Sequence, residues 1–122
     1  MAISVKAAKA KGRALQQLVR DKLIELLKEY GIEAGDIKSA VMGETGEDIQ
    51  LSPLARTFLP ISIECKAHKA FAIYKHWEQA TGASGDRQPV LVIKGDRKKP
   101  LACIDLDYYI ELEYARIKQE EQ

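Results

Sequence analysis

The sequence has few of the features that mark secreted, membrane-spanning or disordered proteins. Its only two cysteines, Cys65 and Cys103, lie inside apolar runs, where a thiol is more often a small buried hydrophobe than half of a disulfide. No apolar run approaches the roughly 20 residues that span a bilayer, and Met1 to Lys11 has no apolar stretch of signal-peptide length. We therefore expect an intracellular protein that is neither secreted nor inserted in a membrane.

An excess of charge of one sign is also missing. The chain has 19 basic and 18 acidic residues, a net charge of +1, so any affinity for nucleic acid must come from local clusters of charge. With 46% hydrophobic and 30% charged residues among 122, the composition is that of an ordinary globular protein. A chain of this length predicts a single domain covering residues 1–122.

Hydrophobic periodicity predicts an α/β fold. Ala8 to Tyr30 has the three-and-four spacing of an amphipathic helix, and Gly31 supplies a stop. Ile61 to Lys66 alternates between apolar and polar residues, which is typical of a half-buried strand. The other expected strands are Ile37 to Met42, Glu47 to Leu51, Val90 to Ile93 and Leu101 to Ile104. The other expected helices are Ser52 to Phe58, with Ser52 as its N-cap and Pro53 at its first position, Ala72 to Thr81, closed by Gly82, and Asp107 to Glu120, where Tyr108, Ile110, Leu112 and Ile117 are available for packing. The order predicts a mixed sheet of about five strands flanked by helices.

Three side chains of this pattern could share one site. Residues two apart on a strand point to the same face, so Glu64 and Lys66 stand side by side while Cys65 faces the core. Asp48 lies 16 residues earlier, on the preceding predicted strand. Two carboxylates can share a divalent cation such as Mg²⁺, and an ammonium beside them can orient an attacking water.

The tripeptide acid-x-Lys is common and carries little information alone. It occurs three times here, at Asp36, Glu64 and Asp96, and only the Glu64 copy lies in a cleanly alternating strand with an acid on the neighbouring predicted strand. The alternative is a solvated face of an edge strand with a weak ion pair.

The arrangement of these residues resembles a nuclease superfamily. Gly46-Glu47-Asp48-Ile49 followed by Ile61-Ser62-Ile63-Glu64-Cys65-Lys66, with Lys11-Gly12-Arg13 opening a long helix, is similar to the PD-(D/E)xK nucleases and most similar to small phage-type and archaeal Holliday-junction resolvases. The resemblance covers about Lys11 to Leu112. It implies a restriction-endonuclease-like core in the order αβββαββα, and an Mg²⁺-dependent DNA hydrolase that also accepts Mn²⁺ and forms a homodimer. A phage-encoded member would act in the cytoplasm of the host cell.

Roles for individual residues follow from the resemblance. It implies Asp48 and Glu64 as metal ligands, the carbonyl of Cys65 as a further ligand, and Lys66 as the residue that positions the water. The chain departs from the pattern in the first helix, where resolvases commonly carry a glutamate four residues after the Lys-Gly pair and this chain has Gln16, followed by Gln17. An amide supplies no charge, so a second metal ion is less expected, unless Asp21, one turn further on, substitutes for the acid.

Further candidates surround this site. Nucleases of this type often place a glutamine or lysine on the helix after the catalytic strand, which makes Gln79 a catalytic candidate, the alternative being a solvent-facing side chain. His68 and His76 flank the region, and each fits a surface or packing role better than catalysis. Basic residues form two clusters, one at the start of the chain and one in the predicted hairpin loop: Lys6, Lys9, Lys11 and Arg13, and Arg97, Lys98 and Lys99. The expected DNA contacts are Lys11, Arg13, Gln16, Gln17, Arg87, Arg97, Lys98 and Lys99, and the basic residues equally fit a soluble terminus and a soluble loop.

Three functions agree with this sequence. The first is a structure-selective endonuclease that cuts branched DNA. The second is a homing or restriction-type nuclease with sequence specificity, which the small size of the chain disfavours. The third is a DNA-binding recombination accessory module without catalysis, an alternative that Gln16 keeps open.

Overall fold

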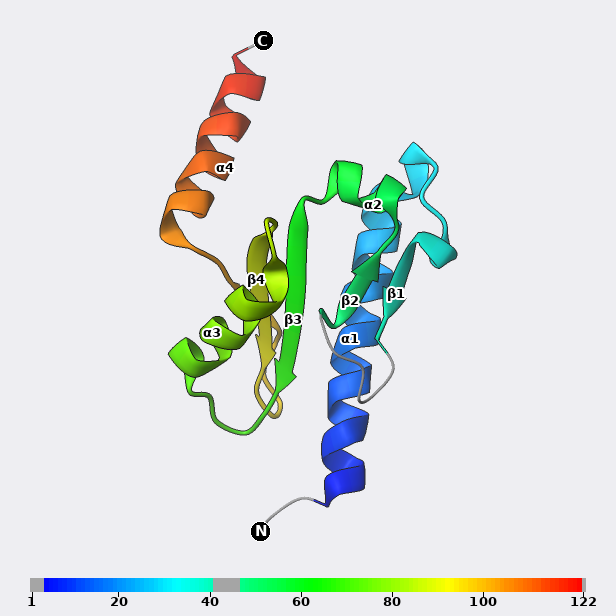
Figure 1. Cartoon of the computed structure of the whole chain (residues 1–122), viewed down its shortest axis with the longest axis vertical. Helices are drawn as coiled ribbons and strands as arrows, with labels where there is room; N and C mark the ends of the chain where they lie inside the picture. Colours follow the sequence, from blue (N-terminus) through cyan, green and yellow to red (C-terminus); the bar gives the residue numbers. More distant parts are fainter. Residues whose placement is uncertain (1–3, 41–46, 122) are drawn as a thin grey trace.

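The computed structural model of the chain describes residues 4–40 and 47–121, and this part has a mixed α/β fold (Figure 1). Its strands form two sheets. β1 (Ile37–Ser39) and β2 (Ile49–Leu51) are antiparallel, while β3 (Ile61–Ala67), β4 (Gln88–Lys94) and β5 (Leu101–Cys103) form a three-stranded sheet in that order. β3 is parallel to β4, and β5 is antiparallel to β4.

Helices separate these strands. They are α1 (Val5–Leu27), α2 (Pro53–Phe58), α3 (Ile73–Ser84) and α4 (Leu106–Glu120), with short 3-10 turns at η1 (Lys28–Tyr30) and η2 (Ala34–Asp36). Apart from the short α2, which was itself expected, the sequence of elements follows the predicted order of helix, three strands, helix, two strands and helix. The particular restriction-endonuclease-like fold stays a prediction.

The first helix is longer at its start than expected. The Ser4 hydroxyl caps it by accepting a hydrogen bond of 3.1 Å from the backbone N–H of Ala7, so helix geometry begins at Val5. The expected stop is confirmed at Gly31, whose φ of 84° lies in the left-handed region that glycine adopts without strain.

The start of α2 agrees with the sequence prediction, and the end of α3 does not. The predicted cap of α2 is confirmed, because the Ser52 hydroxyl accepts a hydrogen bond from the N–H of Ala55 and Pro53 opens the helix. The predicted end of α3 at Gly82 is wrong. The helix continues to Ser84 and ends at Gly85, whose φ is 61°.

The core lies between α1 and the strands. Leu15 and Leu27 of α1 are buried together with Ile37, Ile49 and Ile63, and Val19, Leu23, Ile61 and Cys65 pack against this cluster. In Figure 1, α1 runs along β1 and β2, and α3 lies on the other side of β3. Both cysteines are free, as expected.

The expected single sheet of about five strands is divided in two in the described residues. The predicted strand Ile37 to Met42 ends at Ser39, and the one at Glu47 to Leu51 begins at Ile49. Val41, Met42 and the predicted turn Gly43 to Gly46 lie outside the described residues. The two sheets approach each other where the backbone N–H of Asp48 donates a hydrogen bond of 3.1 Å to the carbonyl of Ile63.

The last helix differs from expectation in its packing. Of the four side chains expected to pack, Tyr108 is half-buried, but Ile110, Leu112 and Ile117 are exposed, and none of the described residues of α4 is buried. Figure 1 shows α4 extending beyond the sheets. Its apolar residues have the period of a packing face, and none of them is buried against the described part of the chain.

Candidate active site

The two faces of β3 have different neighbours. Ile61, Ile63 and Cys65 pack against the core cluster that contains α1. The alternation of a strand therefore turns Glu64 and Lys66 to the opposite face, the side on which α3 lies. The expected arrangement, in which Cys65 faces the core and its two neighbours share the other face, agrees with this packing.

Asp48 is attached to the middle of β3 by its backbone and its side chain. Its N–H donates to the Ile63 carbonyl at 3.1 Å, and its Oδ2 accepts a hydrogen bond of 2.7 Å from the N–H of Cys65. Asp48 immediately precedes Ile49, which is fully buried. Because neighbouring residues of extended chain point to opposite sides, the carboxylate of Asp48 turns away from the core and toward Glu64.

The carboxyl group of Glu64 is held in an unfavourable environment for negative charge. Burial, the negative charge of Asp48 and a hydrogen bond with Asp48 raise the pKa of Glu64 to about 7, although the ammonium of Lys66 opposes this rise. The Glu64 side chain is only 13% exposed. A carboxyl group whose negative charge is destabilised in this way is suited to bind a cation or a proton.

Lys66 is the cation beside this pair of acids. Its Nζ lies 3.7 Å from Oε1 of Glu64, and its side chain is 24% exposed. At this distance the ammonium contributes charge without a tight hydrogen bond, and its partial exposure lets it reach a molecule bound on the same face. The structure thus brings together Asp48, Glu64 and Lys66, the three residues predicted to form the centre of the site.

A buried ion pair that the sequence did not indicate supports Asp48. The Glu47 side chain is 9% exposed, and its Oε2 lies 2.5 Å from NH2 of Arg87, while NH2 of Arg56 on α2 lies 3.7 Å from Oε1. Arg87 also donates a hydrogen bond of 3.2 Å to the carbonyl of Ile61. Arg87, expected in a DNA-contacting loop, is therefore engaged inside the protein and joins the start of β3 to the residue before Asp48.

Two histidines extend the same face of β3. The rings of His68 and His76 stack at a centroid separation of 5.2 Å and an interplanar angle of 9°, and Phe71 meets both rings edge-on. Burial, His76 and Lys66 lower the pKa of His68, and Nδ1 of His76 is buried with no hydrogen-bond partner in the part of the chain that the structure describes. His68 is exposed and His76 half-buried, and these contacts fit the surface or packing role that the sequence favoured for each.

The glutamine candidates are in three different environments. Gln79 is exposed on α3, and its catalytic role stays a prediction. Gln17 is exposed on α1, whereas Gln16 is 8% exposed and its Oε1 is buried without a partner among the described residues. A buried amide oxygen without a donor costs about 1–3 kcal/mol. Gln16 is thus polar where packing alone would favour an apolar residue.

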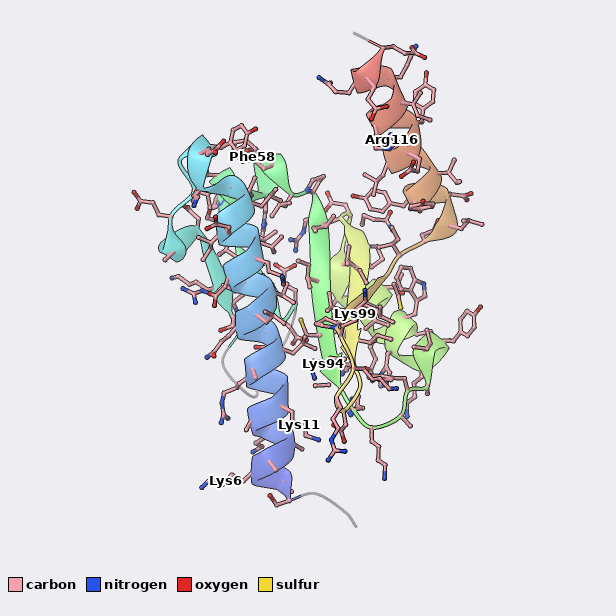
Figure 2. The ribbon with its side chains drawn as sticks, turned by 180° about the vertical axis from the view of Figure 1, so that it is seen from behind. Lys6, Lys11, Phe58, Lys94, Lys99 and Arg116 are labelled. Carbon is pink, nitrogen blue, oxygen red and sulfur yellow. The ribbon has the colours of Figure 1, made fainter. Side chains whose placement is uncertain are left out.

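The two predicted basic clusters lie at the same end of the molecule. Lys11 pairs with Asp96 at 2.5 Å, which joins α1 to the loop between β4 and β5. Both residues line a pocket of about 500 Å³ together with Lys94 and Arg97. Figure 2 shows Lys11 and Lys94 near one another, with Lys6 toward the start of α1. Arg13, Lys98 and Lys99 are exposed.

Whether this site can hold a divalent cation depends on its donors. The described residues contain no group of three or more His, Cys, Asp or Glu side chains placed around a common point. Asp48 and Glu64 supply two carboxylates, and Mg²⁺ is commonly held by one or two carboxylates while it keeps several waters. Burial and the negative charge of Asp48 raise the pKa of Glu64, and a bound cation would offset both effects by stabilising the ionised carboxylate. The donor set therefore fits one Mg²⁺ or Mn²⁺ ion, with the Cys65 carbonyl as the further ligand that the resemblance implies.

Comparison of the chain with protein-family models, with curated proteins and with solved structures found no match. The resemblance to PD-(D/E)xK nucleases therefore rests on the residues quoted from the sequence. No helix in the described ranges is long and apolar enough to cross a membrane. DNA and a second copy of the chain stay predictions as partners.

Proposed function

We propose that this chain is a metal-dependent DNA endonuclease of the PD-(D/E)xK type that cuts branched DNA, as a Holliday-junction resolvase does. The observation that carries the proposal is the convergence of Asp48, Glu64 and Lys66, in which two acids crowd each other beside one lysine. A solvated ion pair on an edge strand would not raise the pKa of Glu64 to about 7 by burial and by the charge of a second acid.

Each residue of the site has a separate role in the proposed phosphodiester hydrolysis. Asp48 and Glu64 would hold the cation, which when bound supplies positive charge to the phosphate and acidifies water. Lys66 lies beside Glu64 on the same face, where its ammonium can orient a water or stabilise charge developing on a phosphate oxygen. The Cys65 N–H fixes the Asp48 carboxylate, and the Glu47–Arg87 pair fixes the segment that carries it.

DNA binding in this proposal comes from the basic end of the molecule. Lys11, Lys94 and Arg97 line one pocket, and exposed Lys98 follows Arg97 in the same loop. Arg13 is exposed on α1, two residues after Lys11. Phosphate contacts of this kind bind without reading base sequence, which suits recognition of DNA shape.

A panel of DNA substrates tests the proposal and separates its alternatives. The purified chain is incubated with a four-way junction, a flap, and random duplexes of equal length, in Mg²⁺, in Mn²⁺ and in EDTA. We expect metal-dependent cuts at symmetric positions of the junction. Cleavage of one duplex sequence only would favour a restriction-type nuclease, and tight junction binding without any cleavage would favour an accessory module.

A further inference from the structure

A pocket lies between α1 and the loop that joins β4 to β5. Its volume of about 500 Å³ falls within the range of about 300–1,000 Å³ that is usual for small-molecule sites. Part of its lining is apolar and comes from Leu15 and Leu18 of α1 and from Ala67 of β3, and the rest is largely charged. A ligand that matches this lining therefore combines an apolar part with a charged part.

The charged part of the lining has an excess of positive charge. Lys11, Lys94 and Arg97 line the pocket together with a single acid, Asp96. Three cations and one acid leave a net charge of +2 among the lining residues. A phosphate monoester carries a charge of about −1.5 to −2 at neutral pH, whereas a carboxylate or a phosphodiester carries a single negative charge. The lining therefore matches a phosphate monoester better than it matches the other two anions.

Asp96 lies where these cations meet. Its Oδ1 is 2.5 Å from Nζ of Lys11. The hydrogen bond from Lys11, together with the charges of Lys11, Lys94 and Lys69, lowers the pKa of Asp96, although burial opposes this change. The carboxylate of Asp96 is thus held by cations as a bound phosphate would be, and a phosphate in the pocket would compete with it for Lys11.

The loop that carries Asp96 is a tight turn with a strained residue. The backbone N–H of Lys98 donates a hydrogen bond of 3.1 Å to the carbonyl of Gly95, and a Cβ at Gly95 would lie only 3.2 Å from Cγ of Lys98. Arg97 has a φ of 59°, in the left-handed region that favours glycine. An arginine kept in this conformation, with its side chain lining a pocket, is typical of a binding site.

The apolar part of the lining is suited to a flat ring. Leu15 and Leu18 lie three residues apart on α1 and so present one apolar surface to the pocket. Arg97 lines the same pocket, and the guanidinium plane of arginine stacks on nucleobases. A nucleobase joined to a phosphate therefore has a matching surface for each of its parts.

We propose that this pocket binds a nucleotide that ends in a phosphate monoester, with the phosphate bound by Lys11, Lys94 and Arg97 and the base on the apolar part of the lining. Two sources have this chemistry, a free nucleoside monophosphate and the phosphorylated end of a DNA strand. The second source rests on the proposed function as a DNA nuclease. Binding is measured in EDTA without any cleavage, so failure of this proposal and failure of the nuclease proposal are distinguishable.

Calorimetric titration of the full chain tests the choice of ligand. In EDTA, deoxyadenosine monophosphate should bind at one molecule per chain, and deoxyadenosine and inorganic phosphate should each bind at least tenfold more weakly, because each lacks one part of the ligand. Short duplexes with phosphorylated ends are compared with the same duplexes with hydroxyl ends. Tighter binding of the phosphorylated ends assigns the pocket to DNA strand ends, and binding of the free nucleotide alone assigns it to free nucleotides. Binding of neither ligand at millimolar concentration, or equal binding of inorganic phosphate and the nucleotide, would overturn the proposal.

Removing the competing carboxylate should strengthen nucleotide binding. Asp96→Asn frees Lys11 for the phosphate and should lower the dissociation constant of deoxyadenosine monophosphate at least threefold. Glu25→Gln is the matched control, because Glu25 is an exposed acid of α1 that pairs with Lys28 outside the pocket, and this variant should bind as the parent does. Weaker binding by Asp96→Asn, or the same change in both variants, would overturn the role of Asp96.

Arg97→Gly separates binding from folding. Glycine adopts a φ of 59° without strain, so the melting temperature of this variant should not be lower than that of the parent. The variant lacks the guanidinium and should bind the nucleotide at least tenfold more weakly. Lys28→Ala removes one exposed positive charge outside the pocket and should keep the affinity of the parent. Unchanged affinity in Arg97→Gly, or an equal loss in Lys28→Ala, would overturn the proposal, and circular dichroism confirms that each variant is folded.

Discussion

The backbone N–H of Cys65 donates a hydrogen bond of 2.7 Å to Oδ2 of Asp48. This bond links the residue before β2 to the middle of β3, although the two strands belong to separate sheets in the described residues. It fixes one carboxylate beside Glu64, where burial and then the negative charge of Asp48 raise the pKa of Glu64.

Removing the charge of Glu64 should stabilise the metal-free protein at high pH. The folded-state pKa of Glu64 is raised from 4.5 to about 7, so its contribution to stability is fully present below pH 4.5 and is lost as the pH rises through 7. In EDTA at pH 8, Glu64→Gln should therefore be more stable than the parent by on the order of 1–2 kcal/mol, allowing for solvent screening. Urea unfolding at pH 4.5 and pH 8 measures this, and a difference that grows toward pH 4.5 would contradict it.

Divalent cations should stabilise the folded protein through Asp48 and Glu64. At a concentration of Mg²⁺ or Mn²⁺ ten times the dissociation constant, mass action adds about 1.4 kcal/mol, which raises the melting temperature by a few degrees. Asp48→Asn and Glu64→Gln should lose this rise. Asp21→Asn is the matched control, because Asp21 is the exposed acid of α1 that could replace the missing glutamate. If Asp21→Asn also lost the rise in melting temperature, Asp21 would be a ligand of the cation and the metal site would include α1.

Arg87 should contribute more to the free energy of unfolding than a surface arginine does. Arg87→Ala leaves the Glu47 carboxylate, which is 9% exposed, with only the more distant Arg56, and should cost about 1–3 kcal/mol. Arg116→Ala removes exposed ion pairs only and should cost less than about 1 kcal/mol. Denaturant unfolding compares the two variants.

A double-mutant cycle identifies the cause of that loss. Glu47→Gln combined with Arg87→Ala removes both charges and should be less destabilised than the sum of the single variants, because no unpaired buried charge is left. If the destabilisation of the double variant equals the sum of the two single variants, the Glu47–Arg87 pair does not hold the segment before Asp48. Arg87 would then fit the surface contact with DNA that the sequence predicted.

Neutralising the basic end should weaken DNA binding and reduce its dependence on salt. Each lost phosphate contact lowers the slope of log affinity against log salt by about 1, so Arg97→Ala with Lys98→Ala should reduce the slope by about 1–2. Lys28→Ala with Lys118→Ala removes the same charge from positions outside the pocket, and its slope should match that of the parent. Fluorescence anisotropy with a labelled junction gives both slopes, and equal losses in the two variants would disprove the assignment of this surface.

Local sequence patterns predicted the elements and the centre of the site. The caps at Ser52 and Gly31 and the alternation of β3 depend on near neighbours in the chain, and the sequence contains that information. Lys66 and Glu64 share a face for the same reason. Asp48 required an assumption about strand adjacency, and the hydrogen bonds to Ile63 and Cys65 provide that adjacency.

Features that depend on contacts between distant segments were not predicted. Arg87 looked like a charged loop residue because nothing in its neighbourhood indicates that Glu47, 40 residues earlier, meets it in a nearly buried pair. Gly82 looked like a helix stop, yet the packing of Ala80 and Ser84 keeps α3 helical to Ser84. For α4, periodicity indicated a packing face without identifying its partner.

Single-turnover cleavage of a four-way junction, measured together with junction binding, tests the central claim most directly. In Mg²⁺ the parent chain should cut the junction, while Asp48→Asn and Lys66→Met should lower the cleavage rate by at least about a hundredfold, comparable to the loss of one transition-state contact, and should bind the junction within about threefold of the parent. Lys69→Met removes a charge three residues further on and should cut at nearly the parent rate. Undiminished cleavage by Asp48→Asn, or a parent chain that cuts no DNA in any divalent metal, would contradict the account.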